Sequence, residues 1–281
     1  MAEPVTGVII PAYKAEALIT HAVRSVLAQT RPDWEIWVVS DDLQDYEAVL
    51  GRLGIADRRI RYLSTGKVGA GTSRARNLAL DTMTTRYVAI LDADDLMKPE
   101  KLARAAEALE HHPIVATALD VMDEDFRHLR YVGRGPDLVL TPGAYKFTSL
   151  SMDSMIVWDR EKTDARYDLE ITNMTDLELL MRLWERADRV AYLGTPLHDY
   201  VKLTRSMSNG PGVTEKMIRS KKTMLHRLES GHYRFAAPDA AEGLARFLRL
   251  SLDAEALFPA AMEKTPGLLF EDHLEPMLKR G

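Results

Sequence analysis

The stretch Val88-Ala89-Ile90-Leu91-Asp92-Ala93-Asp94-Asp95 decides the fold class, because an apolar run leads directly into three carboxylates. The apolar run predicts a buried strand of a parallel sheet. Residues i and i+2 of an extended chain project to the same side, so Asp92 and Asp94 can act together. Two such carboxylates can hold Mg²⁺ or Mn²⁺ while the phosphates of a ligand complete its coordination. Open α/β sheets bind ligands at this carboxyl end of their strands.

Strand and helix patterns alternate on both sides of this stretch. We expect strands at Val5 to Ile10, Trp34 to Val39, Ile60 to Leu63 and Arg86 to Leu91, and helices over Ala15 to Gln29, Asp45 to Leu53, Thr72 to Thr82 and from Pro99 onward. Thr72 or Ser73 is the expected cap of the third helix. This alternation predicts an α/β fold with a mostly parallel, Rossmann-like sheet that has helices on both faces.

The pattern loosens after Asp120. The remaining expected elements are strands at Leu129 to Val132, Met155 to Trp158 and Val190 to Leu193, a helix over Asp176 to Arg186, turns at Gly133 to Pro136 and Pro142-Gly143, and helices beyond Pro211 with breaks at Pro238 and Pro259. The second half therefore carries fewer strand–helix units than the first, and a helical extension follows it.

Composition excludes several classes of function. A net charge of −5 argues against a nucleic-acid binder, which normally carries a basic surplus. The absence of cysteine excludes disulfides, thiolate catalysis and cysteine-bound zinc. Met1 is not followed by a leader pattern, and no run reaches the roughly 18 to 20 apolar residues that span a bilayer. We expect a cytoplasmic protein without a transmembrane segment, with peripheral membrane contact left open.

Two other enzyme classes use an Asp-x-Asp or a similar α/β layout. Haloacid-dehalogenase-type phosphotransferases place the motif on the first strand and have Thr or Val where this chain has Leu96. Sugar nucleotidyltransferases carry a Gly-rich loop with Arg after the first strand, where this chain has Pro11-Ala12-Tyr13-Lys14. Both patterns disfavour these classes.

Four segments together resemble glycosyltransferase family 2, whose members are inverting enzymes with the GT-A fold. They are Val8 to Tyr13, Val38 to Asp42, Ala75 to Asn77 and Leu91 to Asp95. Their order and spacing match as far as Ala105, and fainter similarity continues to Ser208. The resemblance implies a GT-A domain over residues 1–210, with a nucleotide-sugar-binding half at 1–119 and an acceptor-binding half at 120–210. Residues 211–281 would form a C-terminal helical extension.

The resemblance also implies a reaction and its participants. A sugar would move from a nucleotide-diphospho-sugar, UDP- or GDP-linked, to a hydroxyl of a saccharide or lipid-linked acceptor, with Mn²⁺ or Mg²⁺ as cofactor. Asp92 and Asp94 would form the metal site, and Asp176 matches the family's catalytic base. The residues implied for nucleotide binding are Pro11, Ala12, Tyr13, Asp41, Gly71, Arg76, Asp92 and Ala93. Asp41 would accept a hydrogen bond from the base.

The chain departs from the family at several positions. Ser40 replaces the first Asp of the base-binding signature, and Thr175 replaces the Glu before the catalytic Asp. In the segment that closes over the donor, from Tyr200 to Ser208, an Arg and a His are missing at 201 and 203. His198, Lys202 or Arg205 is the candidate to substitute for them, and the sequence leaves open which one does so.

These departures keep open the alternative of a non-catalytic module that retains a nucleotide pocket. A separate alternative concerns the basic stretch Lys216 to Arg234. It suits an anionic membrane or a lipid-phosphate acceptor, and it also suits a solvated helix face.

Overall fold

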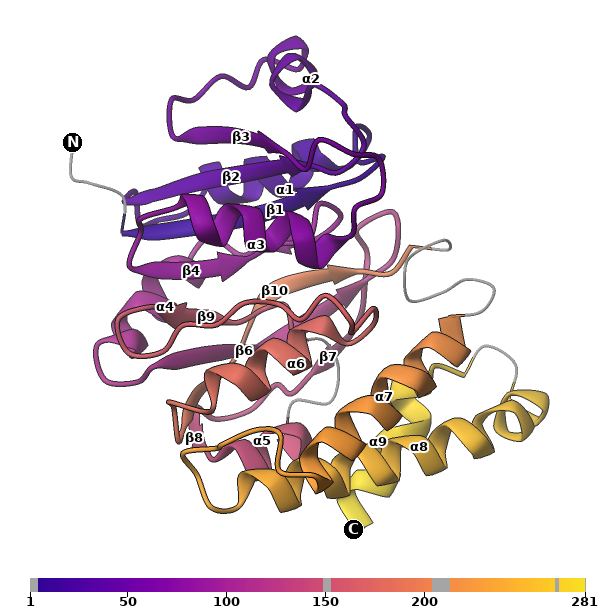
Figure 1. Cartoon of the computed structure of the whole chain (residues 1–281). Coiled ribbons are helices and arrows are strands. Elements are labelled where there is room, and N and C mark those ends of the chain that lie inside the picture. The colour runs from indigo at the N-terminus through magenta and orange to yellow at the C-terminus, as the bar shows by residue number, and fades with distance from the viewer. Residues whose placement is uncertain (1–4, 149–152, 204–212, 266–267, 281) are drawn as a thin grey trace.

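The computed structural model describes residues 5–148, 153–203, 213–265 and 268–280 (Figure 1). Its strands are β1 (Thr6–Ala12), β2 (Trp34–Ser40), β3 (Ile60–Ser64), β4 (Tyr87–Ile90), β5 (Leu96–Met97), β6 (Ile114–Met122), β7 (His128–Val132), β8 (Leu138–Leu140), β9 (Val157–Asp159) and β10 (Val190–Val201). Its helices are α1 (Ile19–Leu27), α2 (Tyr46–Arg52), α3 (Thr72–Thr82), α4 (Lys101–Leu109), α5 (Pro142–Thr148), α6 (Thr175–Leu183), α7 (Val213–Glu229), α8 (Ala240–Lys264) and α9 (Phe270–Arg280).

The described strands form one sheet in the order β3-β2-β1-β4-β9-β6-β10-β5, with β7 paired to β6 and β8 paired to β10. The first four strands in this order are parallel. β9 then runs antiparallel between β4 and β6, and β6 and β10 are again parallel. The predicted α/β class is confirmed, with a parallel first half and a mixed second half.

Helices cover both faces of the sheet, which explains the continuous apolar strands. Val8, Ile9 and Ile10 of β1 are all fully buried. One core cluster packs the sheet against α1, α2 and α4. The other packs it against α3 and α6, and continues into the three C-terminal helices. Figure 1 shows α3 and α6 in front of the sheet and α7, α8 and α9 grouped beside the second half.

The structure corrects the prediction at three places in the second half. Ile114–Met122 forms the buried strand β6, which the sequence did not suggest. The expected turn at Pro142 opens α5, where a proline at the first helical position loses no hydrogen bond. The expected break at Pro259 was wrong, because α8 continues through it to Lys264. Pro259 lies on an exposed end of the helix, where water can bond the carbonyl that the proline leaves free.

Ion pairs help to hold the C-terminal helices to one another and to the rest of the chain. Lys221 of α7 is buried and lies 2.5 Å from Glu255 of α8. Arg227 of α7 reaches Asp168, which precedes α6. Two cations of the basic stretch are therefore neutralised internally. Among the described residues, no helix combines the length and apolar character needed to cross a membrane.

Candidate active site

The predicted site residues gather at one edge of the sheet. β1, β2 and β4 are parallel neighbours, so their carboxyl ends lie together and carry Tyr13, Asp41 and Asp92. Helix α3 brings Arg76 to this edge, and α6 brings Asp176. The structure thus assembles residues that the sequence spreads over more than half of its length.

Asp41 organises the loop in front of α3. Its Oδ1 accepts hydrogen bonds from the amide of Ala70 at 2.9 Å and the hydroxyl of Thr65 at 2.8 Å, and its Oδ2 accepts one from the amide of Gly71 at 2.9 Å. Gly71, with φ of 105°, is the N-cap residue of α3, so the prediction of Thr72 or Ser73 as cap was wrong. Glycine has no side chain that could cap the helix, and the Asp41 carboxylate instead holds the two backbone amides that immediately precede its first turn.

The adjacent Asp42 fixes the turn after β1. It accepts hydrogen bonds from the amide of Lys14 at 2.6 Å and from the hydroxyl of Tyr46 at 2.9 Å. Ser40, which stands where the family has Asp, donates to the same carboxylate. Burial alone would raise the pKa of Asp42, but the hydrogen bonds, led by that from Lys14, hold the pKa below its ordinary value. Both acidic residues after β2 therefore shape the backbone beside Tyr13.

Arg76 joins the two most important predicted carboxylates. Its Nη2 lies 2.6 Å from Oδ1 of Asp92, and its Nη1 lies 2.9 Å from Oδ1 of Asp176. The hydroxyl of Tyr167 also donates to Oδ1 of Asp176, at 2.8 Å. Arg76 is only 2% exposed, so the expected nucleotide contact is here a buried bridge between carboxylates. Sequence reasoning missed Tyr167, because nothing local marks a tyrosine that meets α3 and α6 only through the fold.

Burial governs the proton affinities of this cluster. It raises the pKa of Asp176, although the charge of Arg76 opposes the shift. Burial would lower the pKa of Arg76, but Asp176, Tyr167 and Asp92 raise it overall, so the guanidinium stays charged. A carboxylate with raised proton affinity, held in place by a permanent cation, has the properties of a general base.

Asp94 has the character of a metal ligand. Burial and the nearby charge of Asp92 raise its pKa to about 6. Among the described residues no cationic side chain pairs with it, so a cation there would remove an electrostatic penalty. The described residues contain no group of three or more metal-binding side chains. The donor set of two carboxylates therefore fits a Mg²⁺ or Mn²⁺ ion whose remaining ligands are phosphate oxygens and water.

Two of the three cations that could replace the missing Arg and His are engaged elsewhere. His198 is fully buried between Lys101 and Asp95 and faces no donor site. Lys202 has its Nζ 3.2 Å from Glu271 of α9. Arg205, Ser206 and Ser208 lie outside the described residues. Within the described part, the guess that His198 supplies the missing cation was wrong.

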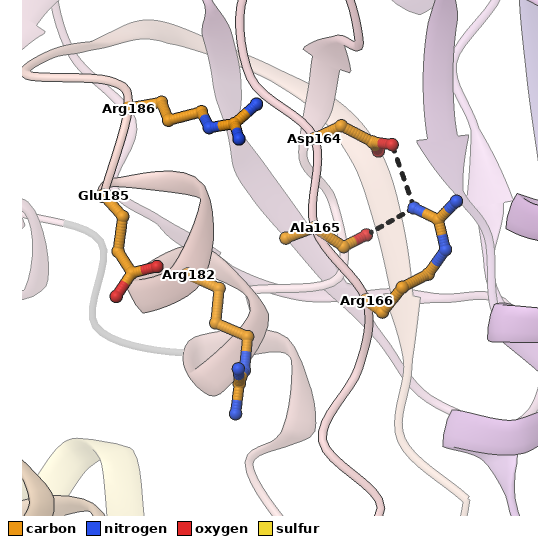
Figure 2. A pocket seen from close by; sticks show the side chains of 6 residues that line it. All are labelled: Asp164, Ala165, Arg166, Arg182, Glu185 and Arg186. Atoms are coloured by element: carbon orange, nitrogen blue, oxygen red, sulfur yellow. Dashed lines mark hydrogen bonds and ion pairs between the residues drawn. The ribbon is translucent and has the colours of Figure 1, made fainter. Parts of the chain in front are cut away.

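Two surface pockets lie apart from the carboxylates of Asp92, Asp94 and Asp176. Figure 2 shows one of about 210 Å³, bordered by Asp164, Arg166 and Arg182 among others. Two of its three arginines are already paired with carboxylates, since Arg166 bonds to Asp164 and Arg182 to Asp168. The other, of about 310 Å³, lies between β2, β3 and α2 and is bordered by Ser40 and Leu43.

Comparison with known sequences identifies the family. A family model described as glycosyl transferase family 2 matches residues 7–153. TuaG of Bacillus subtilis, named for teichuronic acid biosynthesis, is 29% identical over 217 residues, which are 74% of this chain and 82% of TuaG. The UDP-Glc:alpha-D-GlcNAc-diphosphoundecaprenol beta-1,3-glucosyltransferase WfgD of Escherichia coli is 37% identical over 102 residues, which are 36% of this chain and 40% of WfgD.

Solved structures share the fold at low sequence identity. S. aureus TarS 1-349 in complex with UDP-GlcNAc is similar with a TM-score of 0.71 and 16% identity, over 97% of this chain and 79% of that one. The mannosyltransferase PcManGT from Pyrobaculum calidifontis, in complex with GDP-Man and Mn²⁺, gives a TM-score of 0.61 and 15% identity, over 99% of this chain and 86% of that one. With the family match over 7–153, these likenesses establish that the chain belongs to glycosyl transferase family 2 and is a glycosyltransferase of the GT-A fold.

Proposed function

We propose that this glycosyltransferase moves a sugar from a UDP- or GDP-linked donor to an acceptor hydroxyl by metal-dependent, inverting displacement, with Asp176 as the base. One observation carries the proposal: a single buried guanidinium, that of Arg76, contacts both Asp176 and Asp92. The residue that would deprotonate the acceptor therefore lies beside the residues that would hold the donor. Direct displacement requires this proximity.

The loop Asp92–Asp95, called the metal loop below, would hold the divalent ion through Asp92 and Asp94. When bound, the ion supplies positive charge to the leaving diphosphate. Asp92 also contacts Arg76, so its carboxylate keeps a fixed place whether or not the ion is bound. Ala93 between them is 9% exposed, whereas Asp92 and Asp94 are only partly buried.

Asp176 would take the proton of the acceptor hydroxyl. Its Oδ1 accepts the hydrogen bonds from Arg76 and Tyr167. Within the described residues no hydrogen bond is made to Oδ2, which leaves this oxygen for the acceptor. The side chain is 19% exposed, so the carboxylate is reachable from solvent although its pKa is raised by burial.

The nucleotide base would lie at the ends of the first three parallel strands. Tyr13, Leu43 and Val68 follow β1, β2 and β3, and are 48%, 59% and 61% exposed. Large apolar side chains at one sheet edge suit the flat face of a base. Pro11 and Ala12 would support this surface from β1. The loop held by Asp41, which ends in Gly71, would bring backbone close to the ligand.

The acceptor would approach from the 120–210 half of the proposed 1–210 domain, and residues 211–281 would support this half from outside. TarS and PcManGT, which share the fold, are described with UDP-GlcNAc and with GDP-Man and Mn²⁺, and this supports a nucleotide-sugar donor and a metal ion here. WfgD is named for a diphosphoundecaprenol-linked acceptor, which supports a saccharide or lipid-linked acceptor. A cytoplasmic location, where nucleotide-sugars are made, is part of the proposal.

A thermal-shift screen tests this proposal. UDP, GDP and their sugar conjugates are added with and without Mn²⁺, and a ligand that binds the native state raises the melting temperature. We expect Mn²⁺-dependent stabilisation by one nucleotide family, lost in Asp94→Ala. Asp253→Ala, at an exposed position on α8, is the control and should behave as the wild type. The proposal fails if no nucleotide stabilises the protein, or if Asp94→Ala keeps the metal-dependent shift.

A further inference from the structure

Three buried polar side chains meet at the end of the metal loop, and they come from three separate segments of the chain. Lys101 opens α4 and His198 lies in β10, and both are fully buried. Asp95, the last residue of the metal loop, is 2% exposed. None of these three positions is available to a ligand, so the mechanism above leaves them without a role.

The three side chains form one directed chain of hydrogen bonds. Nζ of Lys101 lies 2.7 Å from Nδ1 of His198, and Nε2 of His198 lies 3.1 Å from Oδ2 of Asp95. The imidazole is neutral and has one N–H group, and the carboxylate of Asp95 accepts, so Nε2 carries the hydrogen and Nδ1 accepts one from Lys101. Asp95 also accepts a hydrogen bond through Oδ1 from the amide of Val201, at 2.9 Å. The metal loop is thus bonded at two points to the last strand of the GT-A sheet.

Burying these three polar side chains costs free energy, and the packing of the core alone does not explain why they are there. Other buried lysines of the chain face a carboxylate directly, as Lys221 faces Glu255 and Lys146 faces Asp153. Lys101 instead faces an imidazole, which burial and the neighbouring ammonium keep neutral by lowering its pKa. A buried cation without a directly bonded carboxylate is a poor source of stability. A fully bonded polar chain does, however, specify position, because each member accepts only one geometry.

We propose that Lys101 and His198 are positioning residues that clamp the metal loop to β10. The clamp fixes Asp95, and through the backbone it fixes the neighbouring Asp94. It also fixes the end of β10 at Val201. The effect on metal binding rests on the proposed role of Asp94, whereas the clamp itself is a property of the free protein.

Hydrogen exchange of the ligand-free protein tests the clamp. Lys101→Met removes the donor to His198, while His198→Gln can still accept from Lys101 and donate to Asp95. We expect the Val201 amide to exchange at least tenfold faster in Lys101→Met, and near the wild-type rate in His198→Gln. Lys221→Met removes an equally buried lysine from α7 and is the matched control. Unchanged exchange in Lys101→Met, or equal acceleration in Lys221→Met, overturns the clamp.

Calorimetric titration of Mn²⁺ in the presence of saturating UDP or GDP tests the consequence for the metal site. We expect Lys101→Met to weaken Mn²⁺ binding about tenfold and Lys221→Met to leave it unchanged. Faster exchange with unaltered Mn²⁺ affinity would make the chain structural only and would overturn its positioning role. If the wild type itself binds no Mn²⁺ with either nucleotide, the proposed function fails, and the exchange result alone decides the clamp.

Discussion

Nη1 of Arg76 lies 2.9 Å from Oδ1 of Asp176, a contact that joins two residues 100 positions apart in the sequence. The same guanidinium bonds Asp92, so α3, the metal loop and α6 meet at one buried cation. Arg76 thereby sets the distance between the proposed base and the proposed metal site before any substrate is bound. The consequences of this geometry can be measured in variants of each partner.

Asp176→Asn should remove most of the activity while the protein still binds its donor. An amide cannot take the acceptor proton, and general-base catalysis contributes on the order of 10²- to 10⁴-fold. We expect kcat to fall by that factor and nucleotide affinity, from the thermal shift with Mn²⁺, to stay within a few-fold. Loss of nucleotide binding in this variant would instead place Asp176 in the donor site.

Arg76→Met should lower both the folding stability and the activity more than Arg76→Lys does. Removing the shared cation leaves Asp92 and Asp176 unpaired, and breaking a buried ion pair costs on the order of 3 kcal/mol. A lysine retains the charge but cannot bond both carboxylates in the fixed fork of a guanidinium. We expect Arg76→Lys to be nearly as stable as the wild type, yet slower in kcat. Urea unfolding and steady-state kinetics separate these effects, and equal kinetics in wild type and Arg76→Lys would contradict the bridging role.

The nucleotide-binding half could be predicted from the sequence because its signals are local. Each strand there is a short apolar run and each is followed by a helix of clear period, so the alternation alone fixes a parallel sheet. The Asp-x-Asp after β4 lies at the end of such a run and could be recognised without any contact information. The carboxyl ends of neighbouring parallel strands then had to meet.

The second half of the chain and the hydrogen-bond partners within the site could not be predicted in the same way. Strand β6 has the sequence Ile-Val-Ala-Thr-Ala-Leu-Asp-Val-Met, whose small residues and lone Asp weaken the strand signal. Its burial comes from β9 and β10, and the residues that it pairs with there are 42 or more positions away along the chain. The contacts of three further residues could not be predicted either, because tertiary structure alone determines their partners. These residues are Tyr167, Lys101 and His198. The guess that His198 serves the donor failed for this reason.

Asp41→Ala should loosen the loop before α3 and weaken donor binding together. The variant leaves the amides of Ala70 and Gly71 without their acceptor, at a cost of about 1–3 kcal/mol. If the loop supports the nucleotide base, affinity for the nucleotide with Mn²⁺ should fall at least tenfold. Asp45→Ala, which removes the side-chain cap of α2, is the control that costs stability without changing affinity. Equal nucleotide affinity in both variants would separate Asp41 from donor binding.

Lys101 should make the folding stability of the wild type depend on alkaline pH. Burial lowers the pKa of Lys101 from 10.5 to about 7, although Asp95 and Asp199 oppose the shift. Between these two values the unfolded chain binds the proton and the folded chain does not, so the free energy of unfolding rises with pH across this window. At 1.36 kcal/mol per pH unit, the gain from pH 7 to pH 10 is about 4 kcal/mol. Urea unfolding of wild type and Lys101→Met at several pH values should therefore give curves that diverge by this amount. The exposed Lys222→Met on α7 should follow the wild type, and parallel curves for wild type and Lys101→Met would show that Lys101 keeps its proton in the fold.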